Sequence, residues 1–269
     1  AVANAHTLIK ICEVFLLFPL MGWVVKATYR IVPGEDGCST DAYELKYIQP
    51  EGSVSPATAV VDGIHELQQM GELAMNNLKM SMEALCEPDE KKIKEVCEQE
   101  AYIDFLNRQI TDYLVKISEL DLPIADAKIL GGLFHVVNDI ERIGDHAENF
   151  AEAAKERMEK QIPFSEKAIR QIREMAEMVT EVLDYALQMF SERSTEHMKE
   201  VLQLEEAVDQ LERNLPKAHV KRLTKGKCTP EASMLYSDAL SGLERAADHA
   251  TNIAFAILEP EDLSEEEEE

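Results

Sequence analysis

The sequence has 269 residues, of which 45% are hydrophobic and only 6% aromatic, with 11 Gly and 10 Pro. So few turn-forming residues favour long helices and argue against a β-sandwich or barrel. The 52 acidic and 27 basic side chains give a formal net charge of −25. This charge argues against a nucleic acid partner, because phosphate binding needs Lys and Arg, and it favours cations or basic proteins.

The amino end differs in character from the rest of the chain. Residues 14–25 read VFLLFPLMGWVV and are soon followed by Lys26 and Arg30. The run is shorter than the roughly 20 residues that span a bilayer, yet basic residues at its end are typical of the cytoplasmic side of a membrane segment. We interpret residues 1–30 either as the end of a membrane segment or as a hydrophobic helix docked on the fold. The Pro- and Gly-containing residues 31–56 are predicted to be a linker.

The remainder of the chain consists of two copies of one helical unit. From residue 57 onward, apolar residues recur at alternating spacings of three and four, which is typical of bundled helices. The series in residues 64–85 returns 105 residues later in residues 169–190. Residues 141–151 read ERIGDHAENFA and residues 244–254 read ERAADHATNIA. A block of about a hundred residues is therefore duplicated.

This pattern predicts an all-α fold, a duplicated three-helix bundle preceded by the hydrophobic amino-terminal segment and linker. Short connections predict two antiparallel three-helix repeats, 57–160 and 164–258, followed by an acidic tail, 259–269. Pro216 predicts a kink within the fifth helix. The six helices are expected at residues 57–86, 89–119, 124–160, 164–192, 195–222 and 230–258.

Each repeat carries two ExxxD pairs, which are the candidate functional residues. Residues four apart share one helix face, so both carboxylates of a pair point the same way. Two neighbouring helices could then gather four carboxylates, a suitable site for a hard cation with oxygen ligands. The four pairs are Glu100/Asp104, Glu141/Asp145, Glu205/Asp209 and Glu244/Asp248.

The helical projection places the acids of the first repeat in an apolar environment. Glu100 and Asp104 fall within the apolar sector of the second helix, and Glu141 falls among apolar residues of the third. A buried, unpaired carboxylate is costly, so a metal ion, an Arg or a proton should compensate it. In the second repeat the pattern is weaker, with the glutamates at the edge of the apolar sector and the aspartates further out.

Neighbouring basic residues leave a second interpretation open. Arg108 and Arg213 each follow an ExxxD aspartate by four residues, so a lattice of structural ion pairs accounts for the pattern as well as a metal does. His146 and His249 directly follow an aspartate and lie about 100° round the helix. We expect them to flank the carboxylates rather than to serve as ligands.

Signatures of catalysis are absent from the sequence, and we expect no enzyme. The di-iron carboxylate bundles use Glu-x-x-His on two helices, and no His in this chain has a Glu three residues before it. The HExxH, GxSxG, Walker A and GxGxxG motifs are also missing. The five Cys form no CxxC pair, which argues against a cysteine zinc site and favours a reducing compartment.

The repeated ER-x-x-DHA-x-N-[FI]-A motif resembles the PhoU family of phosphate-transport regulators, over about residues 57–258. The resemblance implies a duplicated three-helix bundle whose ExxxD residues bind divalent or trivalent metal ions, namely iron, manganese, zinc or magnesium. Ala246-Ala247 replaces the Ile-Gly of the first repeat, which puts the equivalence of the two sites in doubt. The implied ligands are Glu100, Asp104, Glu141, Asp145, Glu205, Asp209, Glu244 and Asp248.

A second resemblance lies at the amino end. Residues 3–8, ANAHTL, followed by an apolar run containing Phe18-Pro19, resemble the last membrane segment of the type II sodium/phosphate cotransporter family. Bacterial members of that family carry a PhoU-like domain at their cytoplasmic carboxyl end. The combination implies a regulatory domain that controls phosphate uptake at the cytoplasmic face of the plasma membrane, with the transporter's membrane domain as its partner.

Two other functions remain open at this point. One is a free-standing PhoU-type regulator that docks on a phosphate importer and a sensor kinase. The other is a helical scaffold held by structural salt bridges, with no metal. Inorganic phosphate as a ligand and an oligomeric assembly are compatible with each of these interpretations.

Overall fold

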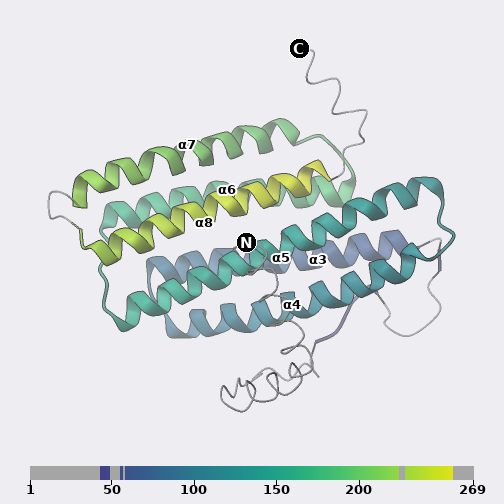
Figure 1. The fold of residues 1–269 in the computed structure, drawn as a ribbon, viewed down its shortest axis with the longest axis horizontal. Coiled ribbons are helices and arrows are strands. Elements are labelled where there is room, and N and C mark those ends of the chain that lie inside the picture. Colours follow the sequence, from purple (N-terminus) through teal and green to yellow (C-terminus); the bar gives the residue numbers. More distant parts are fainter. Residues whose placement is uncertain (1–42, 49–54, 57, 224–227, 257–269) are drawn as a thin grey trace, which may run out of the picture. The chain divides into compact units, whose positions relative to one another are not determined.

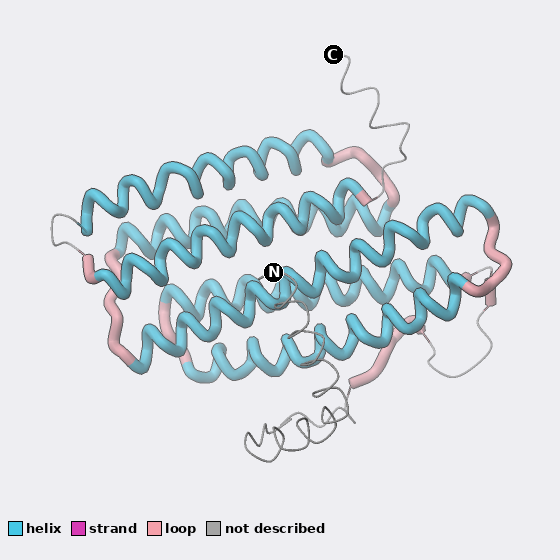
Figure 2. Tube along the Cα trace, in the orientation of Figure 1, coloured by secondary structure: helices cyan, strands magenta, loops and turns pink. Residues whose placement is uncertain are grey.

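The computed structural model describes residues 43–48, 55–56, 58–223 and 228–256, and within them it contains six helices and no strand (Figures 1 and 2). Every helix end lies within three residues of its predicted position, and α7 continues through Pro216. The predicted all-α fold is therefore confirmed. The helices are α3 (Ala59–Cys86), α4 (Glu90–Ser118), α5 (Ile124–Glu159), α6 (Glu166–Glu192), α7 (Met198–Leu223) and α8 (Pro230–Phe255).

The six helices form two three-helix bundles that lie side by side (Figure 1). Helices α3, α4 and α5 contact one another, as do α6, α7 and α8. The two bundles meet where α3 packs on α6 and α5 packs on α8. Helices α4 and α7 therefore lie on the outer sides, and the duplicated three-helix bundle predicted from the repeat is confirmed.

Local sequence signals set the helix ends. The Asp89 side chain caps α4 by accepting hydrogen bonds from the backbone N–H groups of Lys91 and Lys92. Ser165 caps α6 and Thr229 caps α8 in the same way. Such side-chain oxygens satisfy backbone donors that the first turn leaves without partners. These caps mark where α4, α6 and α8 begin.

Small residues allow the two bundles to approach closely. A Cβ atom added at Gly71 of α3 would overlap the methyl groups of Leu187 on α6. A Cβ atom added at Gly242 of α8 would lie 2.7 Å from the ring of Phe150 on α5. Close packing of this kind leaves no room for a larger side chain at either position.

The chain before α3 has two parts. Residues 43–48, within the predicted linker, lie against α3 and α4, with Ile48 only 3% exposed. The expected membrane segment at 1–30 and the acidic tail at 259–269 lie outside the described residues. None of the described helices is both long enough and apolar enough to cross a membrane.

A buried arginine holds the junction between the two repeats. Arg157, near the end of α5, donates hydrogen bonds to the carbonyl oxygens of Leu85 and Cys86 at the end of α3, and to that of Ile162 in the α5–α6 connection. Its guanidinium also lies 4.3 Å from the ring centre of Phe164. Arg157 thus satisfies carbonyl groups that the end of α3 would otherwise leave without partners.

Replacing Arg157 by Met should lower the free energy of unfolding by about 2–3 kcal/mol, because buried carbonyl acceptors lose their donor. Urea unfolding followed by circular dichroism measures this change. Lys160→Met removes a largely exposed cation three residues along the same chain, which makes only a surface ion pair with Glu156, and it should leave the urea midpoint nearly unchanged. Equal midpoints for the Arg157 variant and the wild type would show that the arginine does not stabilise the junction.

Candidate metal centre

The first carboxylate group lies along the seam between α4 and α5. It comprises Glu100 and Asp104 of α4 with Glu141, Asp145 and Glu148 of α5. The charges of the other four all act on Glu100 and raise its pKa. The four acids predicted in the first repeat therefore lie along one seam together with Glu148, although no three of their oxygens lie within 4.8 Å of one another.

Glu100 is the buried member of this group. Only 6% of the residue is exposed, and its Oε1 atom is buried with no hydrogen-bond partner in the described part of the chain. Gly144 of α5 lies beside this position, since a Cβ atom there would be at an ordinary contact distance of 3.4 Å from that oxygen. The Oε2 atom of Glu141 is also buried without a hydrogen bond. The Oε2 atom of Glu141 lies 3.6 Å from Nε of Arg142, whereas the Glu100 oxygen is costly to bury unless a cation or a proton compensates it.

The electrostatics of the group favour protons in the absence of a cation. Burial raises the pKa of Glu100 to about 8, and the neighbouring charges of Asp104, Glu148, Asp145 and Glu141 add to the effect. The pKa of Glu141 is raised by burial and by Asp145, and that of Glu148 by burial and by Glu152. Like charges that meet in a partly buried site disfavour ionisation, whereas a cation would favour it.

Ion pairs occupy the rim of the group. Asp104 is more exposed than its helical projection predicts, with a side chain 45% exposed and 3.8 Å from Arg108. The prediction that Asp104 lies within the apolar sector is therefore wrong, because the sector ends between Glu100 and Asp104. Arg142 lies 3.1 Å from Asp145 and 3.6 Å from Glu141. Within the part of the chain that the structure describes, these pairs involve the other acids of the group and not Glu100.

The second carboxylate group lies along the seam between α7 and α8. Glu205, Asp209 and Asp248 each place an oxygen within 4.8 Å of the others, the one such trio of acids found in the described residues. Glu244 lies outside the trio, although the charges of Asp248 and Asp209 raise its pKa after burial. Burial and Asp209 likewise raise the pKa of Glu205 and Asp248. The second repeat thus holds the closer set of oxygens, despite its weaker sequence pattern.

The two groups differ at two matched positions. Gly144 of the first repeat corresponds to Ala247 of the second, and Glu148 corresponds to Thr251. Glu205 is only partly buried, unlike Glu100. The first group therefore has an additional acid and a deeper one, while the second is shallower. Arg213 also binds Asp209 in the second group, at 2.6 Å.

Glu148 is the site residue that the ExxxD pattern did not reveal. It follows Asp145 by three positions and Glu141 by seven, so all three lie on one helix face. The signal was present in the first repeat as an extended acidic stripe. Thr251 breaks the stripe in the second repeat, so Glu148 has no acidic counterpart at the matched position.

The two histidines lie beside the carboxylates and take no part in the acidic trio, as expected. His249 of α8 is 2.8 Å from Asp139 of α5, and Asn252 donates a hydrogen bond to the same carboxylate. This contact joins the two bundles. His146 lies 6.0 Å from His249 between ring centres, and burial lowers its pKa to about 4.

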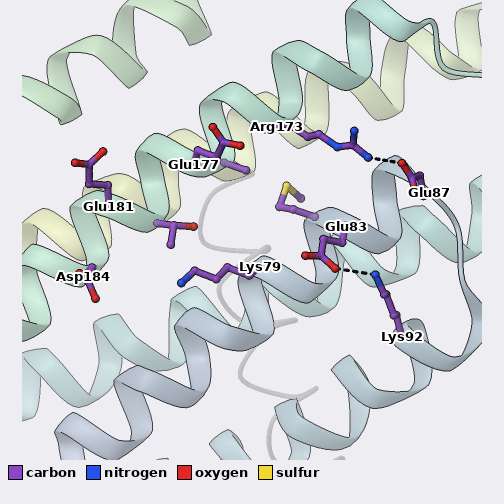
Figure 3. Close-up of a pocket in the computed structure, with 11 residues that line it drawn as sticks. Lys79, Glu83, Glu87, Lys92, Arg173, Glu177, Glu181 and Asp184 are labelled. Carbon is purple, nitrogen blue, oxygen red and sulfur yellow. Dashed lines mark hydrogen bonds and ion pairs between the residues drawn. The ribbon is translucent and has the colours of Figure 1, made fainter.

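A separate hollow of about 680 Å³ lies between α3 and α6 (Figure 3). One side carries Glu177, Glu181 and Asp184 of α6, and the other carries Lys79 and Glu83 of α3. Two ion pairs, Lys92 with Glu83 and Arg173 with Glu87, close one end. No residue of either carboxylate group lines this hollow, so it is distinct from the candidate metal centre.

The substitution Glu100→Gln should change how stability of the metal-free protein depends on pH. In the unfolded chain Glu100 ionises near its ordinary pKa of 4.5, whereas the folded protein keeps the proton until about pH 8. The contribution of Glu100 to stability is therefore full below pH 4.5 and is lost as the pH rises to 8. We expect the melting temperature of the Gln variant to fall less than that of the wild type between pH 5 and pH 8.

Differential scanning calorimetry in the presence of a chelator measures this difference. Glu95→Gln, on the exposed face of the same helix, serves as the control and should follow the wild type. Parallel pH profiles for the wild type and the Glu100 variant would show that Glu100 is not held in its protonated form.

Comparison with known proteins identifies the repeat. The sequence matches the PhoU domain family over residues 67–154 and 172–257, one match for each bundle. A PhoU homolog of the phosphate-specific transport system from Synechocystis is 30% identical over 191 residues, which cover 70% of this chain and 83% of that protein. The homolog 1 of Thermotoga maritima is 25% identical over 194 residues, covering 72% and 83% respectively.

Solved structures agree with these sequence matches. The crystal structure of PhoU from Pseudomonas aeruginosa has a TM-score of 0.70 and 25% identity, and the match covers 76% of this chain and 97% of that one. PhoU from Streptococcus pneumoniae shares the fold, with a TM-score of 0.68 at 19% identity. Both repeats, their order and their helix packing are thus those of a known family, and the chain belongs to the PhoU domain family.

Proposed function

We propose that this chain is a metal-binding regulatory domain that controls phosphate uptake. Membership of the PhoU family supports the regulatory part, because the relatives bear the name of accessory proteins of a phosphate-specific transport system. None of these names describes an enzyme. The regulated partner would be the membrane domain of a transporter or a phosphate importer.

The metal-binding part rests on one observation above all. Glu100 places a buried oxygen without a hydrogen-bond partner at the α4–α5 seam, where the charges of four neighbouring acids act on it. The nearby arginines pair with other acids of the group, Arg108 with Asp104 and Arg142 with Asp145 and the buried Oε2 of Glu141. Carboxylate oxygens are the ligands that hard cations prefer, so the donor set fits manganese, iron or magnesium. Glu100, Asp104, Glu141, Asp145 and Glu148 would hold one ion or cluster, and the second group would hold another with Glu205, Asp209, Glu244 and Asp248.

A bound cation would supply positive charge at a point where two helices otherwise repel each other. The acids of α4 and α5 belong to different helices, so a shared ion would fix the spacing of that seam. The same holds for α7 and α8. Metal state is thereby a property of the bundle surface that a partner protein could recognise.

Within this function, we favour a domain that lies at the cytoplasmic face of the plasma membrane, attached to a sodium-dependent phosphate transporter. The resemblance of residues 3–8 and Phe18-Pro19 to a cotransporter segment supports attachment. A free-standing regulator is the second candidate, because this chain covers 83% of each of two PhoU homologs. The gene sequence distinguishes the two candidates. A reading frame that encodes several membrane helices upstream supports attachment, and a start codon directly before Ala1 supports the free-standing form.

Mass spectrometry of protein purified without added metal tests the proposed centre. We expect stoichiometric iron, manganese or zinc in the wild type, and a loss of part of it in the double variant Glu100→Ala/Glu141→Ala. A second double variant, Glu205→Ala/Asp248→Ala, should lose the complementary part. Removal of oxygen ligands explains both losses.

The matched control is Glu95→Ala/Glu159→Ala, which removes two exposed acids from the same two helices and should retain all the metal. A folded wild type that contains no metal, and that fails to bind manganese, iron or magnesium, would contradict the proposed centre. The carboxylates would then be explained by the structural ion pairs of the rim.

A further inference from the structure

Residues 43–48 dock on the first bundle through a single buried carboxylate. Glu66 of α3 has no exposed surface. One of its oxygens accepts hydrogen bonds from the backbone N–H groups of Lys46, Tyr47 and Ile48, at 3.1, 2.7 and 3.1 Å. A carboxylate that accepts three consecutive backbone donors is bound as an anion binds in a nest.

The burial of Glu66 depends on this segment. Carboxylates are rarely buried fully unless they are paired, and within the described residues the donors to Glu66 come from residues 46–48. Ile48 adds an apolar contact, at 3% exposed, and Leu45 packs on the same core. Without the segment, the Glu66 carboxylate would lose these hydrogen-bond donors, and without Glu66 the backbone N–H groups of residues 46–48 would lose their acceptor.

Helix α4 provides a second anchor. The hydroxyl of Tyr102 donates a hydrogen bond to the carbonyl oxygen of Glu44, at 2.8 Å. The ring of Tyr43 stacks on that of Tyr102, with 4.8 Å between ring centres, and tilts against Phe105 at 5.6 Å. The hydroxyl of Tyr43 also reaches the carbonyl oxygen of Glu98.

These anchors share two turns of α4 with the first carboxylate group. Tyr102 and Phe105 lie within about 60° of each other round the helix, at 100° per residue. Glu100 and Asp104 lie roughly opposite, at about 160–200° from Tyr102. One face of these turns therefore holds residues 43–48, and the other face holds candidate metal ligands.

We propose that residues 43–48 are a tether that couples the chain before residue 43 to the carboxylate-bearing turns of α4, with Glu66 as its lock. A shift or rotation of these turns displaces Tyr102 and hence the tether, and release of the tether loosens the turns in return. The regulatory meaning of the coupling rests on the proposed function, in which α4 binds metal and the preceding chain leads to the transporter. The coupling itself requires no metal.

Hydrogen–deuterium exchange of the whole metal-free chain tests the tether. In Glu66→Ala, the amides of residues 46–48 should exchange at least about tenfold faster, because they lose their acceptor. The peptide that covers residues 98–105 should also exchange faster, whereas peptides of α7 should match the wild type. Glu72→Ala, an exposed acid of the same helix, is the control and should change none of these peptides.

A second variant distinguishes release of the tether from a general loss of stability. Tyr102→Phe removes the hydrogen bond to Glu44 and retains the ring, so it should accelerate residues 43–48 to a smaller extent with the melting temperature nearly unchanged. Wild-type exchange of residues 46–48 in both variants would overturn the tether. Faster exchange of residues 46–48 with wild-type exchange of residues 98–105 would overturn the coupling. Neither result depends on metal content, which is measured separately.

Discussion

The contact between the two bundles decides where the rest of this chain lies. Because α3 packs on α6 and α5 packs on α8, helices α4 and α7 are left on the outer sides. Each outer helix then forms a seam with the third helix of its own bundle, and the acids collect along these two seams. The close approach at Gly71 and Gly242 makes this arrangement possible. The carboxylate groups are thus consequences of how the apolar faces pack.

The two seams use similar acids to different effect. In the first, Glu100 is buried, and the facing helix carries Gly144 and a fifth carboxylate, Glu148. In the second, Ala247 and Thr251 replace these two residues, and three oxygens come close at a shallower position. The two groups of acids, although they occupy matched positions of the repeat, therefore differ in depth and in composition.

Periodicity was sufficient to predict the helices, because each bundle helix buries one stripe of regularly spaced residues. It also predicted that Glu100 would be buried. The same projection was wrong for Asp104, because a helical projection at 100° per residue does not show how far a neighbouring helix shields a residue from solvent. The sequence predicts only a linker at residues 43–48, because the residues that hold this segment, Glu66 and Tyr102, are distant from it in sequence. Contacts of that kind carry no periodic signal.

The packing of like helices on each other gives the fold an approximate two-fold axis, as in a dimer of identical subunits joined in one chain. Gly71 of the first repeat matches Ala176 of the second, and Met82 matches Leu187. The contact of Gly71 with Leu187 therefore has its counterpart in Ala176 and Met82, which both line the hollow between α3 and α6. In the same way, Asp139 matches Gly242 and His146 matches His249, so the contact of Asp139 with His249 has its counterpart in Gly242 and His146. Within the described residues, His249 has a carboxylate partner in the other half and His146 lies beside Gly242 instead, so this polar contact is made on one side, while Arg173 and Glu87 join the halves elsewhere.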